Sequence, residues 1–310
     1  MSDRSRSFLP VYISLSALFL LKFVPVVFPE GRCWGFNHLL FLPIWFTAVF
    51  AILTAAIAIW PFLAFSRTVG SAVLDGFVRA FFESPKRQGN RGLFIVAGAA
   101  LFTLFPMPTH FLGDGYPMLA NLASEAGTFY PWSEIGVVTI VQTIQSWLGP
   151  PSQSTALAAF RVVSVLSGLV TVFFFFLIAE IASQDRTVRL LVFLSSIGSG
   201  VLLLFFGYVE NYPLLWAAYS GFIYFSLHYL RTGRGLIPIP LFLLLAIVMH
   251  FQAAMFVPAF IYLVFCRGKA RAVYNRLKWG LWSLAIAIII VGLAIFYRVY
   301  TSNLYVENIF

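Results

Sequence analysis

The amino-acid sequence predicts an all-α fold, a polytopic bundle of transmembrane helices with about nine membrane crossings. Of the 310 residues, 61% are hydrophobic and only 10% are charged, whereas soluble domains average about 45–50% and 25%. The mean hydropathy is +0.91. Apolar runs long enough to cross a bilayer recur along the chain, and most Lys and Arg residues lie between them. This composition excludes intrinsic disorder, disulfide-rich scaffolds and free cytosolic enzymes.

Seven apolar segments have the length expected of membrane-spanning helices, for which about 17 residues is the practical minimum. The first follows Arg4 and Arg6, and no small-residue cleavage site comes after it, so we expect a retained helix and not a signal peptide. In chain order the expected spans are residues 8–28, 38–62, 92–108, 157–182, 188–206, 213–230 and 279–299.

The apolar stretch 236–265 requires a different interpretation. As one helix its 30 residues would be roughly 45 Å long, more than a hydrocarbon core of about 30 Å. Basic residues flank it on both sides, which places both flanks in the cytoplasm and requires an even number of crossings. We therefore predict two short helices, 236–249 and 251–265, that reverse direction at His250.

The basic residues also orient the chain, because positively charged loops resist translocation. With a cytoplasmic N-terminus and an external C-terminus, the loops on the cytoplasmic side contain 16 of the 20 basic residues. These segments are 1–7, 66–91, 183–189, 231–235 and 266–278. We therefore predict a multi-pass protein of the cell (inner) membrane in contact with membrane lipids. The net charge of +9 is explained by this bias, so we expect no nucleic-acid partner.

The longest external loop, 109–156, contains an expected interfacial helix. Polar and apolar stripes alternate with helical period between Ser133 and Leu148. Trp132 and Trp147 near the ends favour a helix that lies flat in the outer membrane interface. An ordinary connecting helix is an equal alternative.

Two external acidic residues are the strongest candidates for chemistry. Asp114 lies between two glycines, which free the backbone and keep bulky side chains away from its carboxylate. Glu210 lies in a short link between two spans, and carboxylates at membrane depth are costly and tend to mark function. The structural alternatives are a simple turn at Asp114 and a solvated link at Glu210.

Further polar and aromatic residues on the same side are candidates for substrate binding. They are Tyr116, Arg161, Asn211, Tyr212, His250 and Gln252. A structural role is the more common one for a lone histidine, and an arginine at the membrane interface usually snorkels. The sequence contains no nucleotide-binding glycine loop, CxxC pair, HExxH or GxSxG motif.

The order of these motifs resembles the GT-C superfamily of integral membrane glycosyltransferases, which includes protein O-mannosyltransferases and the aminoarabinose transferases of lipid A. A span ends in LGDGY (112–116), and the next one opens with AFRVVS (159–164). An external link YVENYP (208–213) and the sequence MHFQ (249–252) follow. The similarity covers roughly residues 92–265.

The expected spans and loops, together with the resemblance over the middle of the chain, divide the chain into three regions. Residues 1–91 would hold two N-terminal transmembrane helices and a basic cytoplasmic loop, residues 92–265 a GT-C-like catalytic core, and residues 266–310 a basic loop and the last transmembrane helix. The resemblance also implies that a sugar moves from a polyprenyl-phosphate-linked donor to a glycan, lipid or protein acceptor on the non-cytoplasmic side.

The same resemblance implies roles for the candidate residues. Asp114 would be the base or a metal ligand, and Glu210 a second carboxylate that orients the acceptor or the metal. Arg161 and His250 would lie near the donor phosphate, whose charge grows as it departs. A divalent cation, Mg²⁺ or Mn²⁺, would suit the two carboxylates, Asp114 and Glu210, although the sequence does not require one.

Two other classes of function remain open. A polytopic transporter or lipid flippase would use the broken segment 236–265 as its substrate site. A non-catalytic membrane assembly subunit would retain the fold alone. The lack of an inverted repeat and the clustering of acidic residues on one face favour the enzyme over the transporter.

Overall fold

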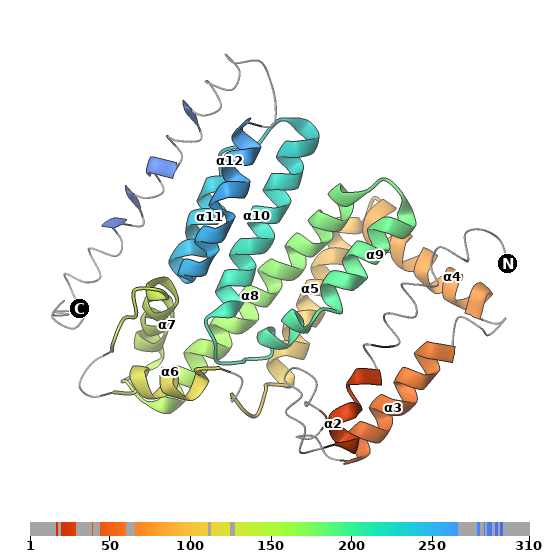
Figure 1. The fold of residues 1–310 in the computed structure, drawn as a ribbon, viewed down its shortest axis with the longest axis horizontal. Helices are drawn as coiled ribbons and strands as arrows, with labels where there is room; N and C mark the ends of the chain where they lie inside the picture. The colour runs from red at the N-terminus through yellow and green to blue at the C-terminus, as the bar shows by residue number, and fades with distance from the viewer. Residues whose placement is uncertain are drawn as a thin grey trace. The chain divides into compact units, whose positions relative to one another are not determined.

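The computed structural model describes residues 17, 20–28, 39, 44–59, 66–110, 113–124 and 128–265, and several positions between 278 and 293. Within this part of the chain the fold is all-helical and contains no strand, which confirms the expected all-α class (Figure 1). The chain divides into two compact units, residues 1–77 and 78–310.

In its described part the first unit contains α2 (Val24–Val27), α3 (Ile44–Ile59) and most of α4 (Ser66–Val78). α3 falls inside the expected span 38–62. The expected spans 8–28 and 279–299 lie largely outside the described residues. The basic segment 66–91, expected as a loop, is helical over most of its length, because a run of basic residues marks a side of the membrane and does not prevent helix formation.

The second unit is built around α8 (Gln153–Ala182), the longest described helix at 30 residues. The α-helices that contact it include α5 (Arg87–Leu104), α6 (Gly115–Leu122), α7 (Ile135–Leu148), α9 (Arg186–Ile197) and α10 (Tyr212–Thr232). The unit also contains α11 (Pro238–Met249) and α12 (Val257–Phe265), which pack against α10 (Figure 1).

A capping box sets the start of α8. The Thr155 N–H donates to the Ser152 hydroxyl at 3.2 Å, and the Ser152 N–H donates to the Thr155 hydroxyl at 3.1 Å. The helix therefore begins before the expected span 157–182, because that span was assigned from the apolar residues alone. By length and composition, α8 is the one described helix that is long and apolar enough to cross a membrane. The expected nine crossings stay a prediction.

The expected span 188–206 is interrupted. α9 ends at Ile197, Ser199 has extended backbone angles (φ −71°, ψ 150°), and a short 3₁₀ helix, η4 (Gly200–Phe205), follows. Gly198 and Gly200 flank the break, and glycine is a poor helix former. The prediction of one continuous helix was wrong here, because apolar composition alone does not reveal a break between two glycines.

The predicted reversal at His250 is confirmed. α11 ends at Met249, His250 is extended (φ −158°, ψ 120°), and the 3₁₀ helix η5 (Phe251–Phe256) leads into α12. Leu236 and Ile239, near the start of α11, share a core cluster with Leu263 and Val264 at the end of α12. The two short helices therefore run side by side in opposite directions (Figure 1).

The amphipathic helix expected after Trp132 is α7, and its apolar side packs against protein. Val137 and Val141 are buried in a core cluster that joins α6, α7, α8, α10 and α11. This side is therefore not available to insert into a lipid surface. Trp132 and Trp147 at the two ends are 64% and 78% exposed. The packing favours the connecting-helix alternative, and the interfacial position stays a prediction.

A buried arginine surrounded by aromatic rings anchors α5 to the C-terminal end of α8. Arg91 is 2% exposed and donates hydrogen bonds to the Phe81 carbonyl (2.8 Å) and to Glu180 Oε2 (3.0 Å). Its guanidinium also lies 5.4 Å from the centre of the Phe82 ring. Glu180 therefore neutralises a buried cation.

Replacing Glu180 should destabilise the second unit. Glu180→Gln leaves the Arg91 charge buried without its partner, so we expect a loss of about 2–3 kcal/mol in the free energy of unfolding in detergent. The matched control is Glu83→Gln, which breaks the ion pair with the exposed Arg186 and should cost less than about 1 kcal/mol. Equal losses for the two variants would contradict this role of Glu180.

Candidate functional site

Two loop segments meet in the second unit. One connects α5 to α6, and the other connects η4 to α10. The Met107 N–H donates to the Phe206 carbonyl at 2.7 Å, and the Val209 N–H donates to His110 Nδ1 at 3.2 Å. His110 is itself buried against the Tyr208 ring, with 5.4 Å between ring centres. These contacts bring together two parts of the chain that are far apart in sequence.

The Glu210 carboxylate lies at this junction. The side chain is 5% exposed, and its Oε2 accepts the Asn211 N–H at 3.2 Å. The Gly113–Asp114 backbone lies against the same carboxylate: a Cβ placed on Gly113 would be 1.6 Å from Glu210 Oε1, and the nearby Asp114 N–H lowers the pKa of the carboxyl. Asp114 and Glu210, the two residues on which the sequence-based mechanism depends, are therefore in direct contact through the Asp114 backbone.

The glycines beside Asp114 make this contact sterically feasible. Gly113 has φ +119°, and a Cβ placed there would lie 1.6 Å from Glu210 Oε1. A Cβ at Gly115 would lie 2.8 Å from the carbonyl oxygens of both His110 and Val209. The sequence-based interpretation was that these glycines clear space around Asp114. In the structure they clear space for Glu210 and for the segment that carries it.

The Asp114 carboxylate is exposed at the start of α6. Asp114 is the N-cap residue of this helix, a position where aspartate usually accepts an N–H from the first turn. Here its side chain makes no capping hydrogen bond. The carboxylate is therefore available to a substrate.

The surroundings of Glu210 raise the pKa of its carboxyl. Burial raises the pKa of the Glu210 carboxyl above its usual range, the N–H donors of Asn211 and Asp114 lower it, and the nearby charges of Asp114 and Glu134 raise it again. The net effect is a raised pKa, so the neutral carboxyl is favoured over a wider pH range than in an exposed glutamate.

A second polar group adjoins the carboxylates. Glu134 Oε1 lies 3.6 Å from His250 Nε2. His250 Nδ1 accepts the Gln252 N–H at 3.3 Å, so the neutral imidazole carries its proton on Nε2, facing Glu134. The Tyr212 ring stacks on the imidazole, with 5.6 Å between ring centres and 14° between planes. Glu134, His250 and Tyr212 form what we call the stacked group.

Glu134 is not among the site residues predicted from the sequence. It is the N-cap residue of α7, in the same loop as Asp114. Its position in the same loop as Asp114 is the sequence signal that could have identified Glu134 as a site residue. The contact with His250 could not be read from the sequence, because it depends on how α7 packs against the end of α11.

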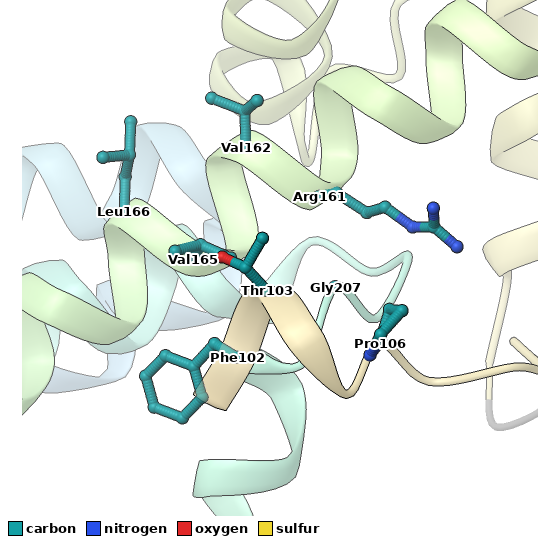
Figure 2. Close-up of a pocket in the computed structure, with 8 residues that line it drawn as sticks. All are labelled: Phe102, Thr103, Pro106, Arg161, Val162, Val165, Leu166 and Gly207. Carbon is teal, nitrogen blue, oxygen red and sulfur yellow. The ribbon is translucent and has the colours of Figure 1, made fainter. Parts of the chain in front are cut away.

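Arg161 lies at a groove between α5 and α8. Its Cγ packs against Gly207, which has φ +71° and where a Cβ would lie 2.9 Å from that atom. The groove has a volume of about 320 Å³ and is lined by Phe102, Thr103, Pro106, Arg161, Val162, Val165, Leu166 and Gly207. Figure 2 shows the guanidinium directed away from Phe102 and Leu166. The groove therefore has an apolar end and a cationic end.

Arg161 makes no ion pair within the described part of the chain. Burial lowers the pKa of the neighbouring His110 imidazole, and the Arg161 charge lowers it further. His110 is therefore neutral at pH 7, and Arg161 keeps its positive charge available for an anion.

The predicted site residues fall into two adjoining sets. Asp114, Glu210 and Asn211 are in contact, and Tyr212 and Gln252 both contact His250. Among the described residues, Asn211 Oδ1 is buried without a hydrogen-bond partner, which leaves an acceptor beside the carboxylates.

The other two predicted residues lie elsewhere around the junction. The Tyr116 ring lies 6.0 Å from the His110 ring. Arg161 packs against Gly207, whereas His250 stacks on Tyr212, so these two residues lie at opposite ends of segment 207–212. The expectation that Arg161 and His250 approach the same phosphate finds no support in their contacts.

The donor atoms are a poor fit for the expected Mg²⁺ or Mn²⁺ ion. Glu210 already accepts the Asn211 N–H and the pKa of its carboxyl is raised, whereas a metal ligand must be deprotonated. No group of three or more His, Cys, Asp or Glu side chains suited to a metal occurs within the described residues. A divalent cation held by Asp114 and Glu210 stays a prediction.

The raised pKa of Glu210 predicts a pH-dependent stability. Between the ordinary glutamate pKa of about 4.3 and the raised value, the folded state binds more protons than the unfolded state. Stability therefore falls as the pH rises through this window. In detergent, Glu210→Gln should lose less thermal stability than the parent on going from about pH 4 to about pH 8. Glu83→Gln is the control, and parallel pH profiles for Glu210→Gln and the parent would contradict the assignment.

Comparison with known proteins finds no match: no family model fits the chain, and no curated protein or solved structure matches it. The similarity to the GT-C superfamily therefore rests on the motifs in the sequence and stays a prediction.

Proposed function

We propose that the chain is a polytopic membrane glycosyltransferase that moves a sugar from a polyprenyl-phosphate-linked donor to an acceptor on the non-cytoplasmic side. The observation that carries the proposal is the junction of Asp114 and Glu210. The Asp114 side chain is exposed, whereas its backbone lies against the buried carboxyl of Glu210. The order of the surrounding motifs, which resembles the GT-C superfamily, supplies the substrate class.

The outer face of α8 supports a membrane environment. Four large apolar side chains on it are 40–54% exposed, and their spacing places them along one stripe of the helix. They are Val162, Leu166, Val170 and Phe173. Exposed apolar surface of this kind is unfavourable in water and is accommodated by hydrocarbon. At 30 residues, α8 is roughly 45 Å long, enough to cross a core of about 30 Å.

Asp114 is the proposed general base. Its exposed carboxylate takes the proton of the acceptor hydroxyl as that oxygen bonds to the anomeric carbon of the sugar. The bond between this carbon and the phosphate oxygen breaks, and the lipid phosphate leaves with the electron pair. Negative charge therefore grows on the phosphate, and a cation must offset it.

The groove beside Arg161 suits the donor. Its apolar end can take the first part of a hydrocarbon chain, and the guanidinium at the other end can donate hydrogen bonds to a phosphate. Because His110 is neutral and Arg161 makes no ion pair among the described residues, the guanidinium retains its charge for the departing group.

The stacked group suits the acceptor. Tyr212 is 38% exposed and presents an aromatic surface, while Glu134 and His250 supply a hydrogen-bond acceptor and a donor. The group lies at the end of segment 207–212 opposite Arg161. Donor and acceptor would then approach Asp114 from two directions, as a displacement reaction requires.

One observation favours a second candidate function. The helical segment from Pro238 to Phe265 is broken at His250, and broken helices with polar residues form the substrate sites of many transporters. A lipid flippase would move the lipid-linked sugar across the membrane without forming a new covalent bond, so the two functions differ in their products.

The proposal is tested with purified protein in liposomes and a panel of radiolabelled polyprenyl-phosphate monosaccharides. We expect covalent transfer of one sugar to an added acceptor, and Asp114→Asn should lower kcat by about 10²–10⁴-fold because the base is lost. Asp75→Asn, at an exposed residue of α4, is the control. Full activity of Asp114→Asn would refute the mechanism, and sugar movement without a new bond would identify a flippase.

Arg161→Gln should reduce kcat/KM for the lipid-linked donor by about 10²-fold, because the phosphate loses its charged partner. Arg161→Lys keeps the charge but loses the planar donor pair, so its activity should be intermediate. Arg234→Gln, at an exposed arginine that follows α10, serves as the control in the same transfer assay. An unchanged kcat/KM for Arg161→Gln would place the donor phosphate elsewhere.

A further inference from the structure

We infer that Glu210 is a positioning residue that holds the Asp114 carboxylate in its working direction, and that it is not a second catalytic carboxylate. This inference rests on the proposed function, because it assigns the roles of the two acids within that site. It replaces the expectation that both carboxylates approach the substrate.

The Glu210 carboxylate lies at the N-cap residues of two helices. Asp114 is the N-cap residue of α6 and Asn211 is the N-cap residue of α10. The Asn211 N–H donates to the Glu210 carboxylate at 3.2 Å, and the Gly113–Asp114 backbone lies against the same carboxylate. In a capping box, an acidic residue in the first turn reaches back to the N-cap N–H of its own helix. Here one carboxyl lies beside the N-cap N–H groups of two helices that are far apart in sequence.

The position of Glu210 also separates it from a substrate. The side chain is 5% exposed, and the Gly113 backbone lies so close to Oε1 that no side chain fits between them. The Asp114 side chain, in contrast, is exposed and makes no capping hydrogen bond. The two acids therefore have different surroundings, and only Asp114 is open to a reacting hydroxyl.

The contact between the Asp114 backbone and the Glu210 carboxyl restricts the direction of the Asp114 side chain. Gly113, the preceding residue, has a positive φ and tolerates many other backbone conformations. Without an acceptor for the Asp114 N–H, the turn at residues 113–114 is free to rotate and the carboxylate moves with it. A displacement of about 1 Å in a reacting group reduces rates by about 10²-fold.

This role requires an oxygen acceptor and does not require negative charge. The carbonyl oxygen of a carboxamide accepts an N–H as a carboxyl does. Glutamine at position 210 should therefore retain most of the function, whereas alanine should not.

The test measures transfer kinetics and amide hydrogen exchange on four variants in liposomes, using the donor identified in the panel. Asp114→Asn should lower kcat by about 10²–10⁴-fold. Glu210→Gln should stay within about fivefold of the parent, while Glu210→Ala should lose about 10²-fold in kcat with little change in KM. Gly113→Ala retains both acids but displaces the Glu210 carboxylate, so it should resemble Glu210→Ala.

Hydrogen exchange distinguishes positioning from loss of the fold. The peptide that contains Asp114 should exchange as slowly in Glu210→Gln as in the parent and faster in Glu210→Ala, while peptides from the middle of α8 remain protected in all variants. If Glu210→Gln loses as much activity as Asp114→Asn while its amide protection is intact, Glu210 is catalytic and the inference is overturned. If Asp114→Asn is fully active, the proposed function itself fails, whatever the exchange data show.

Discussion

The contact between the Gly113–Asp114 backbone and the buried Glu210 carboxyl is the one on which the site depends. It joins the loop after α5 to the loop after η4, and the Val209–His110 bond and the close approach at Gly115 support the same junction. The contact imposes glycine at position 113, because the carboxyl occupies the space of a side chain there. Burial of Glu210 is unfavourable for its charged form, and the two N–H donors only partly offset that cost.

This junction organises the surrounding groups along segment 207–212. Arg161 and the apolar groove lie against Gly207, the carboxyls lie at the centre, and the stacked group of Glu134, His250 and Tyr212 lies at the far end. One short segment therefore separates the groove beside Arg161 from the stacked group. The exposed Asp114 side chain lies beside the centre of this arrangement, where the proposed reaction would need its base.

The features predicted from the sequence are those set by local composition. Helical class follows from apolar runs, and the reversal at His250 follows from the length of the stretch and the charges at its flanks. The prominence of Asp114 and Glu210 follows from the cost of acids near apolar spans. Features that depend on packing were not predicted: the break after Ile197, the pairing of Glu180 with the buried Arg91, and the contact of Glu134 with His250. Each requires knowing which helices are neighbours, and hydropathy does not contain that information.

The central claim is that the carboxyls of Asp114 and Glu210 belong to one site at the non-cytoplasmic rim of a membrane protein. Electron cryomicroscopy of the chain in lipid nanodiscs, at a resolution that shows side chains, tests it most directly. Our account predicts the Glu210 carboxyl about 3 Å from the Asp114 nitrogen, with both residues at the same membrane–water boundary and the Asp114 side chain open to solvent. A map that places the two residues at opposite boundaries, or turns Glu210 away from the start of α6, would contradict it.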